Sequence, residues 1–314
     1  KYEVAKEVWT PKSDLKGAKP VEIGIYYHPD HAYNIERMMT SVKNSLDYYS
    51  EHFSPYGQRQ IRVIEFPRTH GSFAQSYPSN IPFAETMGFI TDLRDINKPG
   101  VPFEEQKIDM PFYVTAHEVA HQWWGHQISA AHVEGANFLV ESMSQYAALK
   151  VMEQAYGKQR IKKFLRTESQ SYMISRSAEK REERPLSTVL NNQQATFYNK
   201  GAVSLYALSE VLGETVFDQA IQALIQKHAY QSHPYPDSDD FIQLLYEFSP
   251  AAQHAYIADQ LEIITVYETE IKQVSYERND ALEYRVELEL DIQKFYADAQ
   301  GKETKVAMDE LIEI

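Results

Sequence analysis

The sequence predicts an α+β protein in which a mixed sheet lobe, a helical lobe and the start of an all-β domain follow one another. Strand-like and helix-like segments alternate up to residue 109. From 110 to 262 apolar residues recur at helical spacing, and after 262 the period drops to two. We therefore expect one domain over 21–262, with lobes 21–109 and 110–262, and a truncated β-domain over 263–314.

The first lobe is predicted to contain strands at 21–27, 61–66 and 87–91 and an amphipathic helix over 32–53. The segment VEIGIYY alternates, IRVIEF is bounded by Pro67, and MGFIT is short and apolar. Residues 1–20 are interpreted as the end of a strand and a linker from an upstream region. The stretch 95–109 carries proline and glycine and is predicted to be a loop.

The second lobe is predicted to begin with a helix that Asp109 caps and Gly125 ends, with Pro111 in its first turn. A second long helix covers 134–157, and further helices are expected at 159–175, 197–212, 214–229, 237–247 and 251–260. Two alternating segments after 262, with a turn at 298–303 between strands, indicate the β-domain.

Composition excludes several kinds of partner and site. The net charge is −14, from 45 acidic and 31 basic residues, which disfavours nucleic acid and anionic membrane surfaces. The chain has no cysteine, so a metal must bind to His, Asp or Glu. No apolar run approaches the roughly 20 residues of a membrane span. The chain lacks an initial Met and stops inside a strand-like pattern, so we expect a piece of a longer protein.

The stretch AHEVAHQWWG contains the residues that can bind a metal ion and activate water. On a helix, His117 and His121 point the same way and can bind one metal ion, while Glu118 lies beside them without being a ligand. A metal at such a site activates water, and the glutamate acts as general base. The alternative is a helix with two histidines satisfied by ordinary hydrogen bonds.

A catalytic zinc site of this type needs a third ligand and an open position. His126, His132 and Glu134 lie in or just after the connecting turn. Glu141 lies within the next predicted helix, with nineteen residues between it and His121, and antiparallel helices would return it over the first helix. We favour Glu141, and Glu134 stays the alternative.

The stretch HEVAHQWWG, followed by LVES, resembles the M1 family of zinc aminopeptidases within the gluzincins, with one extra residue before Glu141. The resemblance implies a thermolysin-like catalytic domain, a peptide substrate and one zinc ion per chain on His117, His121 and Glu141. In FYNKG, Tyr198 matches the family tyrosine that stabilises the oxyanion. In PFAETMGFI, Glu85 matches the glutamate that binds the substrate α-amine.

The sequence around these motifs is also similar to that of bacterial M1 family members associated with ABC-permease-like membrane proteins. That resemblance favours an extracytoplasmic domain of a membrane protein, with a cytoplasmic protein as the alternative. Two rival functions stay open: an M1-like binding or sensory domain that keeps zinc without useful activity, and a structural module without metal. His28 and His31, in HPDH, are interpreted as solvent-facing or locally hydrogen-bonded.

Overall fold

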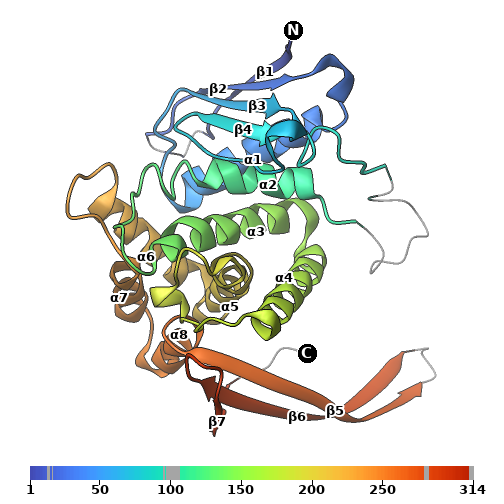
Figure 1. Ribbon diagram of the computed structural model, residues 1–314, viewed down its shortest axis with the longest axis vertical. Helices are drawn as coiled ribbons and strands as arrows, with labels where there is room; N and C mark the ends of the chain where they lie inside the picture. Colours follow the sequence, from blue (N-terminus) through green and yellow to red (C-terminus); the bar gives the residue numbers. More distant parts are fainter. Residues whose placement is uncertain (13–14, 16, 95, 97–106, 279–282, 311–314) are drawn as a thin grey trace.

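The structure is a computed structural model that describes residues 1–12, 15, 17–94, 96, 107–278 and 283–310. A four-stranded sheet lies at one end, a helical lobe lies below it, and a long β-hairpin extends from the opposite end (Figure 1). This arrangement confirms the predicted α+β class with a sheet lobe, a helical lobe and a following β segment. The domain boundaries themselves stay a prediction.

The sheet of the first lobe has the order β1-β2-β3-β4. Strand β1 (Glu3–Trp9) is antiparallel to β2 (Val21–Tyr27), whereas β2, β3 (Gln60–Phe66) and β4 (Asn80–Ala84) run parallel. Alternate residues of β2 and β3 are buried, as the period-two pattern predicts. Helix α1 (Ile35–His52) packs its apolar side into the same core.

The predicted strand at 87–91 is wrong, because the fourth strand is Asn80–Ala84 and residues 85–90 form turns. Ile81 and Phe83 alternate into the core and are fully buried. In the turn, Asn34 Nδ2 donates to the carbonyls of Gly88 and Thr91, at 2.7 and 2.9 Å. A distant side chain therefore satisfies backbone groups that the apolar pattern had assigned to a sheet.

The second lobe is helical, as predicted, and its α-helices are α2 (Met110–Ala120), α3 (Met143–Tyr156), α4 (Lys158–Ala178), α5 (Gly201–Leu212), α6 (Glu214–His228), α7 (Ser238–Phe248) and α8 (His254–Leu261). Asp109 caps α2 by accepting from the backbone N–H of Phe112 at 3.1 Å. After Ala120 the chain tightens into turns up to Gly125, whose φ is +116°. Gly157 ends α3.

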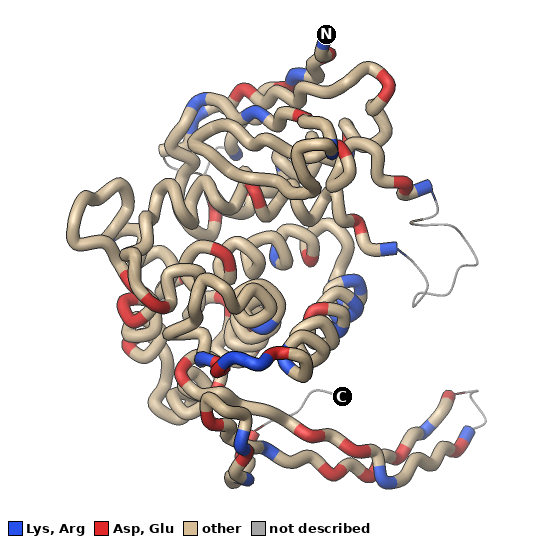
Figure 2. The backbone as a smooth tube through the Cα atoms, in the orientation of Figure 1, with Lys and Arg blue, Asp and Glu red and all other residues tan. Residues whose placement is uncertain are grey.

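The last segment forms a three-stranded antiparallel sheet from β5 (Ile264–Arg278), β6 (Tyr284–Ala297) and β7 (Glu303–Val306). Lys294 of β6 forms an ion pair with Asp259 of α8, and both side chains are buried, so the base of the hairpin is attached to the helical lobe. Acidic and basic residues are interspersed along the hairpin (Figure 2). None of the described helices has the length and apolar character of a membrane span.

Candidate metal centre

Helix α2 and its C-cap residue bring His117 and His121 to one point. Both residues are buried, and their Nε2 atoms lie 3.0 Å apart. Helix α1 holds α2 in place, because Tyr49 Oη donates to the carbonyl of Ala116 at 3.0 Å and Ser41 Oγ donates to that of Phe112 at 2.7 Å. The i, i+4 spacing therefore brings the two rings together on a helix that its neighbour fixes.

Glu141 reaches the two histidine rings from the segment that leads into α3. It lies in the π-helical turn η4 (Phe138–Ser142) that leads into α3, and its Oε2 is 3.4 Å from His117 Nε2 and 3.3 Å from His121 Nε2. Glu134 is exposed and lines a different surface cavity with His132. His126 Nε2 faces the carbonyl of Ser76 at 3.2 Å. Of the four candidates for the third ligand, only Glu141 joins the histidine pair.

The two histidine Nε2 atoms and the Glu141 oxygen have the spacing that a tetrahedrally coordinated cation requires. Ligands about 2.0–2.1 Å from zinc are separated by about 3.3 Å in a tetrahedron, and the observed separations are 3.0, 3.3 and 3.4 Å. Glu141 Oε2 is buried and has no hydrogen-bond partner among the described residues. Two imidazole nitrogens and one carboxylate oxygen are also the donor types that zinc accepts, so the residues fit the ion.

Glu118 lies beside this centre with a partly unsatisfied carboxylate. Its Oε2 is buried and has no hydrogen-bond partner in the described part of the chain. Burial raises the pKa of Glu118, and the neighbouring His117 and His121 offset part of that increase. A carboxylate with a raised pKa is a better proton acceptor near neutral pH than an ordinary glutamate.

The outer nitrogen of His121 has two partners. Its Nδ1 lies 2.9 Å from the carbonyl of Trp124 and 3.0 Å from Ser144 Oγ, which itself donates to the carbonyl of Val140. A proton on Nδ1 satisfies both acceptors and leaves Nε2 directed at Glu141. Burial alone lowers the pKa of His121, but the adjacent carboxylate of Glu141 and the charge of Glu118 outweigh this effect and raise the pKa to about 9.

Tyr198 enters from a second π-helical turn, η6 (Ala195–Lys200). Its ring centroid lies 6.1 Å from that of His117. Burial raises the pKa of the Tyr198 phenol far above its usual value, and the carboxylates of Glu141 and Glu118 raise it further. The phenol therefore stays neutral and can donate a hydrogen bond to a group at the metal centre.

The first π-helical turn touches the second turn and the start of α5 through Ser142. Ser142 Oγ donates to the carbonyl of Phe197 at 2.6 Å, which ties the residue after Glu141 to the residue before Tyr198. A Cβ at Gly201 would lie 2.3 Å from Ser142 Oγ and 2.7 Å from Ser142 Cβ. The glycine of the YNKG segment is therefore required by a close helix approach that places Tyr198 beside Glu141.

Gly201→Ala is expected to destabilise the protein by about 1–3 kcal/mol, because the added methyl group overpacks this contact. Urea denaturation measures the change. A Ser142→Ala/Gly201→Ala double variant removes the nearest atom and should recover part of the loss. Wild-type stability in Gly201→Ala would show that η4 and the start of α5 are not in close contact.

Glu85 lies in a different environment from the metal centre. Its Oε1 accepts from the backbone N–H of Arg68 at 3.2 Å, and its Oε2 lies 3.8 Å from His31 Nδ1. It is not part of the group formed by His117, His121 and Glu141. The substrate-amine role assigned to Glu85 from the sequence stays a prediction.

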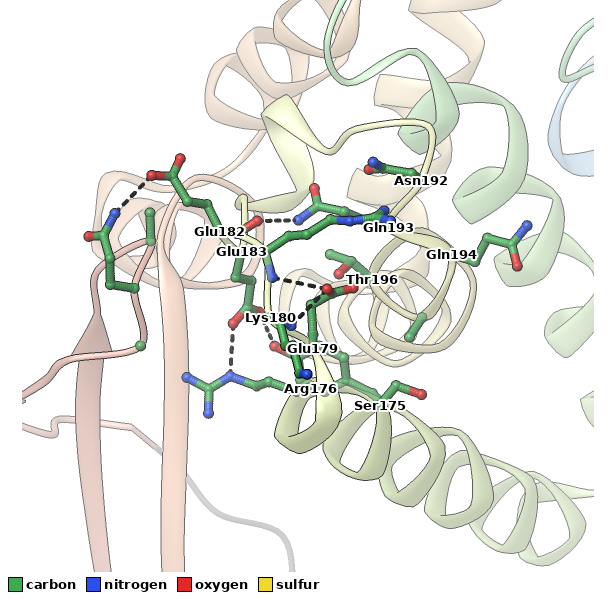
Figure 3. A pocket seen from close by; sticks show the side chains of 16 residues that line it. Ser175, Arg176, Glu179, Lys180, Glu182, Glu183, Asn192, Gln193, Gln194 and Thr196 are labelled. Atoms are coloured by element: carbon green, nitrogen blue, oxygen red, sulfur yellow. Dashed lines mark hydrogen bonds and ion pairs between the residues drawn. The ribbon is translucent and has the colours of Figure 1, made fainter.

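A separate cavity of about 510 Å³ lies between α4, η6 and the turn that joins β6 to β7. Its carboxylates already have partners: Glu183 pairs with Arg176 at 2.8 Å, and Gln300 donates to Glu182 at 2.9 Å (Figure 3). Glu179 accepts from two backbone N–H groups. None of the residues at the metal centre lines this cavity.

A family model described as the peptidase family M1 domain matches residues 99–269, more than half of the chain. The chain belongs to peptidase family M1. The match includes both histidines, Glu118, Glu141 and Tyr198. Comparison with curated protein sequences gives no match.

Solved structures of M1 enzymes share the fold. A mutant of a two-domain M1 zinc metallopeptidase bound to L-tryptophan is 16% identical, with a TM-score of 0.58 over 82% of this chain and 51% of that one. The M1 zinc metallopeptidase from Deinococcus radiodurans is 17% identical, with a TM-score of 0.56 and coverages of 82% and 51%. A mutant of the Deinococcus enzyme bound to a Tyr-Ser-Ala substrate is 17% identical, with a TM-score of 0.57 and the same coverages. This chain spans about half the length of those proteins.

Sequence reasoning missed two residues that support this M1 site. Gln122, next to the second histidine, donates to Ser76 Oγ at 2.7 Å and accepts from the backbone N–H of Ser79 at 2.8 Å. It attaches α2 to the segment before β4. The other is Ser144, which contacts His121. A polar residue on a buried helix face is the one signal that points to Gln122, whereas a small serine on α3 carries no such signal.

Proposed function

We propose that this M1 domain is a zinc-dependent peptidase. The supporting observation is the convergence of His117, His121 and Glu141, whose nearest donor atoms lie 3.0 to 3.4 Å apart. Glu118 and Tyr198 flank that point with the two functions that amide hydrolysis requires, a base and a neutral hydrogen-bond donor. Family membership and the zinc metallopeptidase fold support the proposal.

The proposed roles follow from what each side chain can do. His117, His121 and Glu141 would hold one zinc ion, which when bound polarises a carbonyl group and lowers the pKa of water. The Glu118 carboxylate takes a proton from the attacking water and delivers it to the departing amine. The neutral Tyr198 phenol donates a hydrogen bond to the carbonyl oxygen as that oxygen becomes negative.

We further propose that the substrate is a peptide with a free amino terminus, so that the enzyme is an aminopeptidase. Solved structures of related M1 zinc metallopeptidases contain a bound Tyr-Ser-Ala substrate or a single bound amino acid. Glu85 is the candidate that the family resemblance suggests for the ammonium group. Glu85→Gln should then raise KM for free-amine peptides and leave N-acetylated peptides unaffected.

The decisive experiment combines metal analysis with hydrolysis of aminoacyl fluorogenic substrates by the zinc-loaded protein. Zinc near one equivalent at this centre, with zinc-dependent turnover, supports the peptidase. Bound zinc without turnover on free or N-acetylated peptides favours the binding or sensory alternative. A chain that binds no metal at this centre would have a structural role.

Tyr198→Phe is expected to lower kcat by about 10²- to 10³-fold with little change in KM, since the developing oxyanion exists only near the transition state. The phenyl ring keeps the packing against His117. Steady-state kinetics measure both constants. Tyr246→Phe, which removes a phenol hydroxyl in α7, is the matched control and should keep normal kinetics. A change confined to KM in Tyr198→Phe would instead assign Tyr198 to substrate binding.

A further inference from the structure

Tyr198 lies in a turn whose neighbouring residues are anchored on both sides. The turn η6 is π-helical, and such turns are short, rare and frequent at functional sites. Phe197, the residue before Tyr198, is attached to η4 through its carbonyl group. Asn199, the residue after it, is attached to α4, because its Nδ2 donates to Glu168 Oε2 at 2.5 Å. The phenol of the proposed site is therefore held between two hydrogen-bonded neighbours.

Glu168 occupies a position on α4 where an apolar residue is expected. Ile161, Phe164 and Tyr172 form the buried side of this helix, and Glu168 lies four residues from each of the last two. Burial raises the pKa of Glu168, and the hydrogen bond from Asn199 offsets part of that increase. No lysine or arginine pairs with Glu168 among the residues that the structure describes. A partly buried carboxylate without a cation costs free energy, so an apolar side chain would serve packing better.

The surroundings of Glu168 place it at the junction of α4, η6 and the metal-binding helix α2. Phe164, one turn before it on α4, packs on Tyr113 of α2 with ring centroids 4.4 Å apart. Tyr113 precedes His117 by four residues, so both side chains lie on the same face of α2. Burial raises the pKa of Tyr113, and the negative charge of Glu168 raises it further. The carboxylate is therefore close to the helix that carries the metal ligands.

The attachment of η6 to α4 does not depend on Glu168 alone. Lys200, the last residue of η6, is buried, and its Nζ lies 5.3 Å from the centroid of the Tyr172 ring on α4. This contact already holds the end of the turn against the helix. The bond from Asn199 to Glu168 adds a constraint directly beside Tyr198, and a hydrogen bond to an ionised acceptor is stronger than one between neutral groups. The bond therefore acts on the orientation of the turn more than on its attachment.

We propose that Glu168 is a positioning residue for Tyr198. Its carboxylate accepts a hydrogen bond from the Asn199 amide, fixes the rotation of η6, and so directs the Tyr198 phenol toward the metal centre. Glu168 is not one of the three residues that form the metal centre and acts through Tyr198. This inference rests on the role in peptide hydrolysis that is proposed above for Tyr198.

A double-mutant cycle in steady-state kinetics tests the proposal. Glu168→Ala should lower kcat by about 10- to 100-fold with little change in KM, because a displaced phenol still allows the substrate to bind. Glu168→Gln keeps an acceptor oxygen for Asn199 and should recover most of that loss. In the Tyr198→Phe background, Glu168→Ala should have no further effect on kcat, because the hydroxyl group that it positions is absent.

Gln170→Ala, an exposed change on the same helix, is the matched control and should keep normal kinetics. An equal fall in kcat with and without the Tyr198 hydroxyl group would overturn the proposal. An effect confined to KM, or a failure of Glu168→Gln to recover activity, would overturn it as well. Thermal unfolding shows whether each variant is folded, and Asn199→Ala removes the same hydrogen bond if Glu168→Ala does not fold.

Fluorine NMR gives a second readout that does not require turnover. With fluorotyrosine in place of Tyr198, the fluorine chemical shift should change in Glu168→Ala and return to the wild-type value in Glu168→Gln. That response in a chain without peptidase activity would support the positioning role and refute the proposed function. An unchanged shift in a chain that hydrolyses peptides would overturn the positioning role alone. The two failures are therefore distinguishable.

Discussion

Glu118→Gln is expected to reduce peptide hydrolysis by about 10²- to 10⁴-fold while zinc stays bound. The amide cannot accept a proton from water, but its size and its position beside His117 and His121 are unchanged. Glu118 contributes no ligand atom, because the three donor atoms come from His117, His121 and Glu141. Turnover of a fluorogenic aminoacyl substrate and the metal content of the same sample measure the two effects separately.

Glu134→Gln is the matched control for this variant, since it makes the same chemical change at an exposed position outside the metal centre. It should keep both zinc and activity. Normal turnover in Glu118→Gln would remove the proposed base. Loss of zinc from Glu118→Gln would mean that the carboxylate acts on the ion rather than on the water.

Glu141→Gln is expected to weaken zinc binding at this centre by more than the 10- to 100-fold that changes in outer-shell partners cause. The neutral amide removes the one negative charge among the three donors, and zinc affinity depends strongly on that charge. Zinc at about 100 times its dissociation constant stabilises a protein by about 2.7 kcal/mol, so the rise in Tm on adding zinc should largely disappear. Activity should fall with it.

Glu134→Gln again serves as the control, because Glu134 was the alternative third ligand. A zinc-induced rise in Tm that survives in Glu141→Gln and is lost in Glu134→Gln would move the third ligand to Glu134 and refute the observed geometry. Metal chelation should reproduce the Glu141→Gln phenotype in the wild-type chain.

The sequence pattern predicted the structure correctly where residues close together in the chain determine the backbone conformation. The cap at Asp109, the alternation of β2 and the stop at Gly157 all depend on residues within one or two turns. The strand predicted at 87–91 failed because the backbone there is satisfied by Asn34, more than fifty residues earlier. No local pattern contains that partner.

At the candidate site too, short-range contacts were predictable from the sequence and long-range contacts were not. The sequence by itself determined the pair His117 and His121 with Glu118 between them, since helical periodicity alone places them together. Only the tertiary structure decided that Glu141 rather than Glu134 meets the pair, that Gly201 lets Tyr198 approach, and that Asn199 meets Glu168. Those contacts depend on how helices and strands pack across long stretches of chain, and packing is a property of the assembled core.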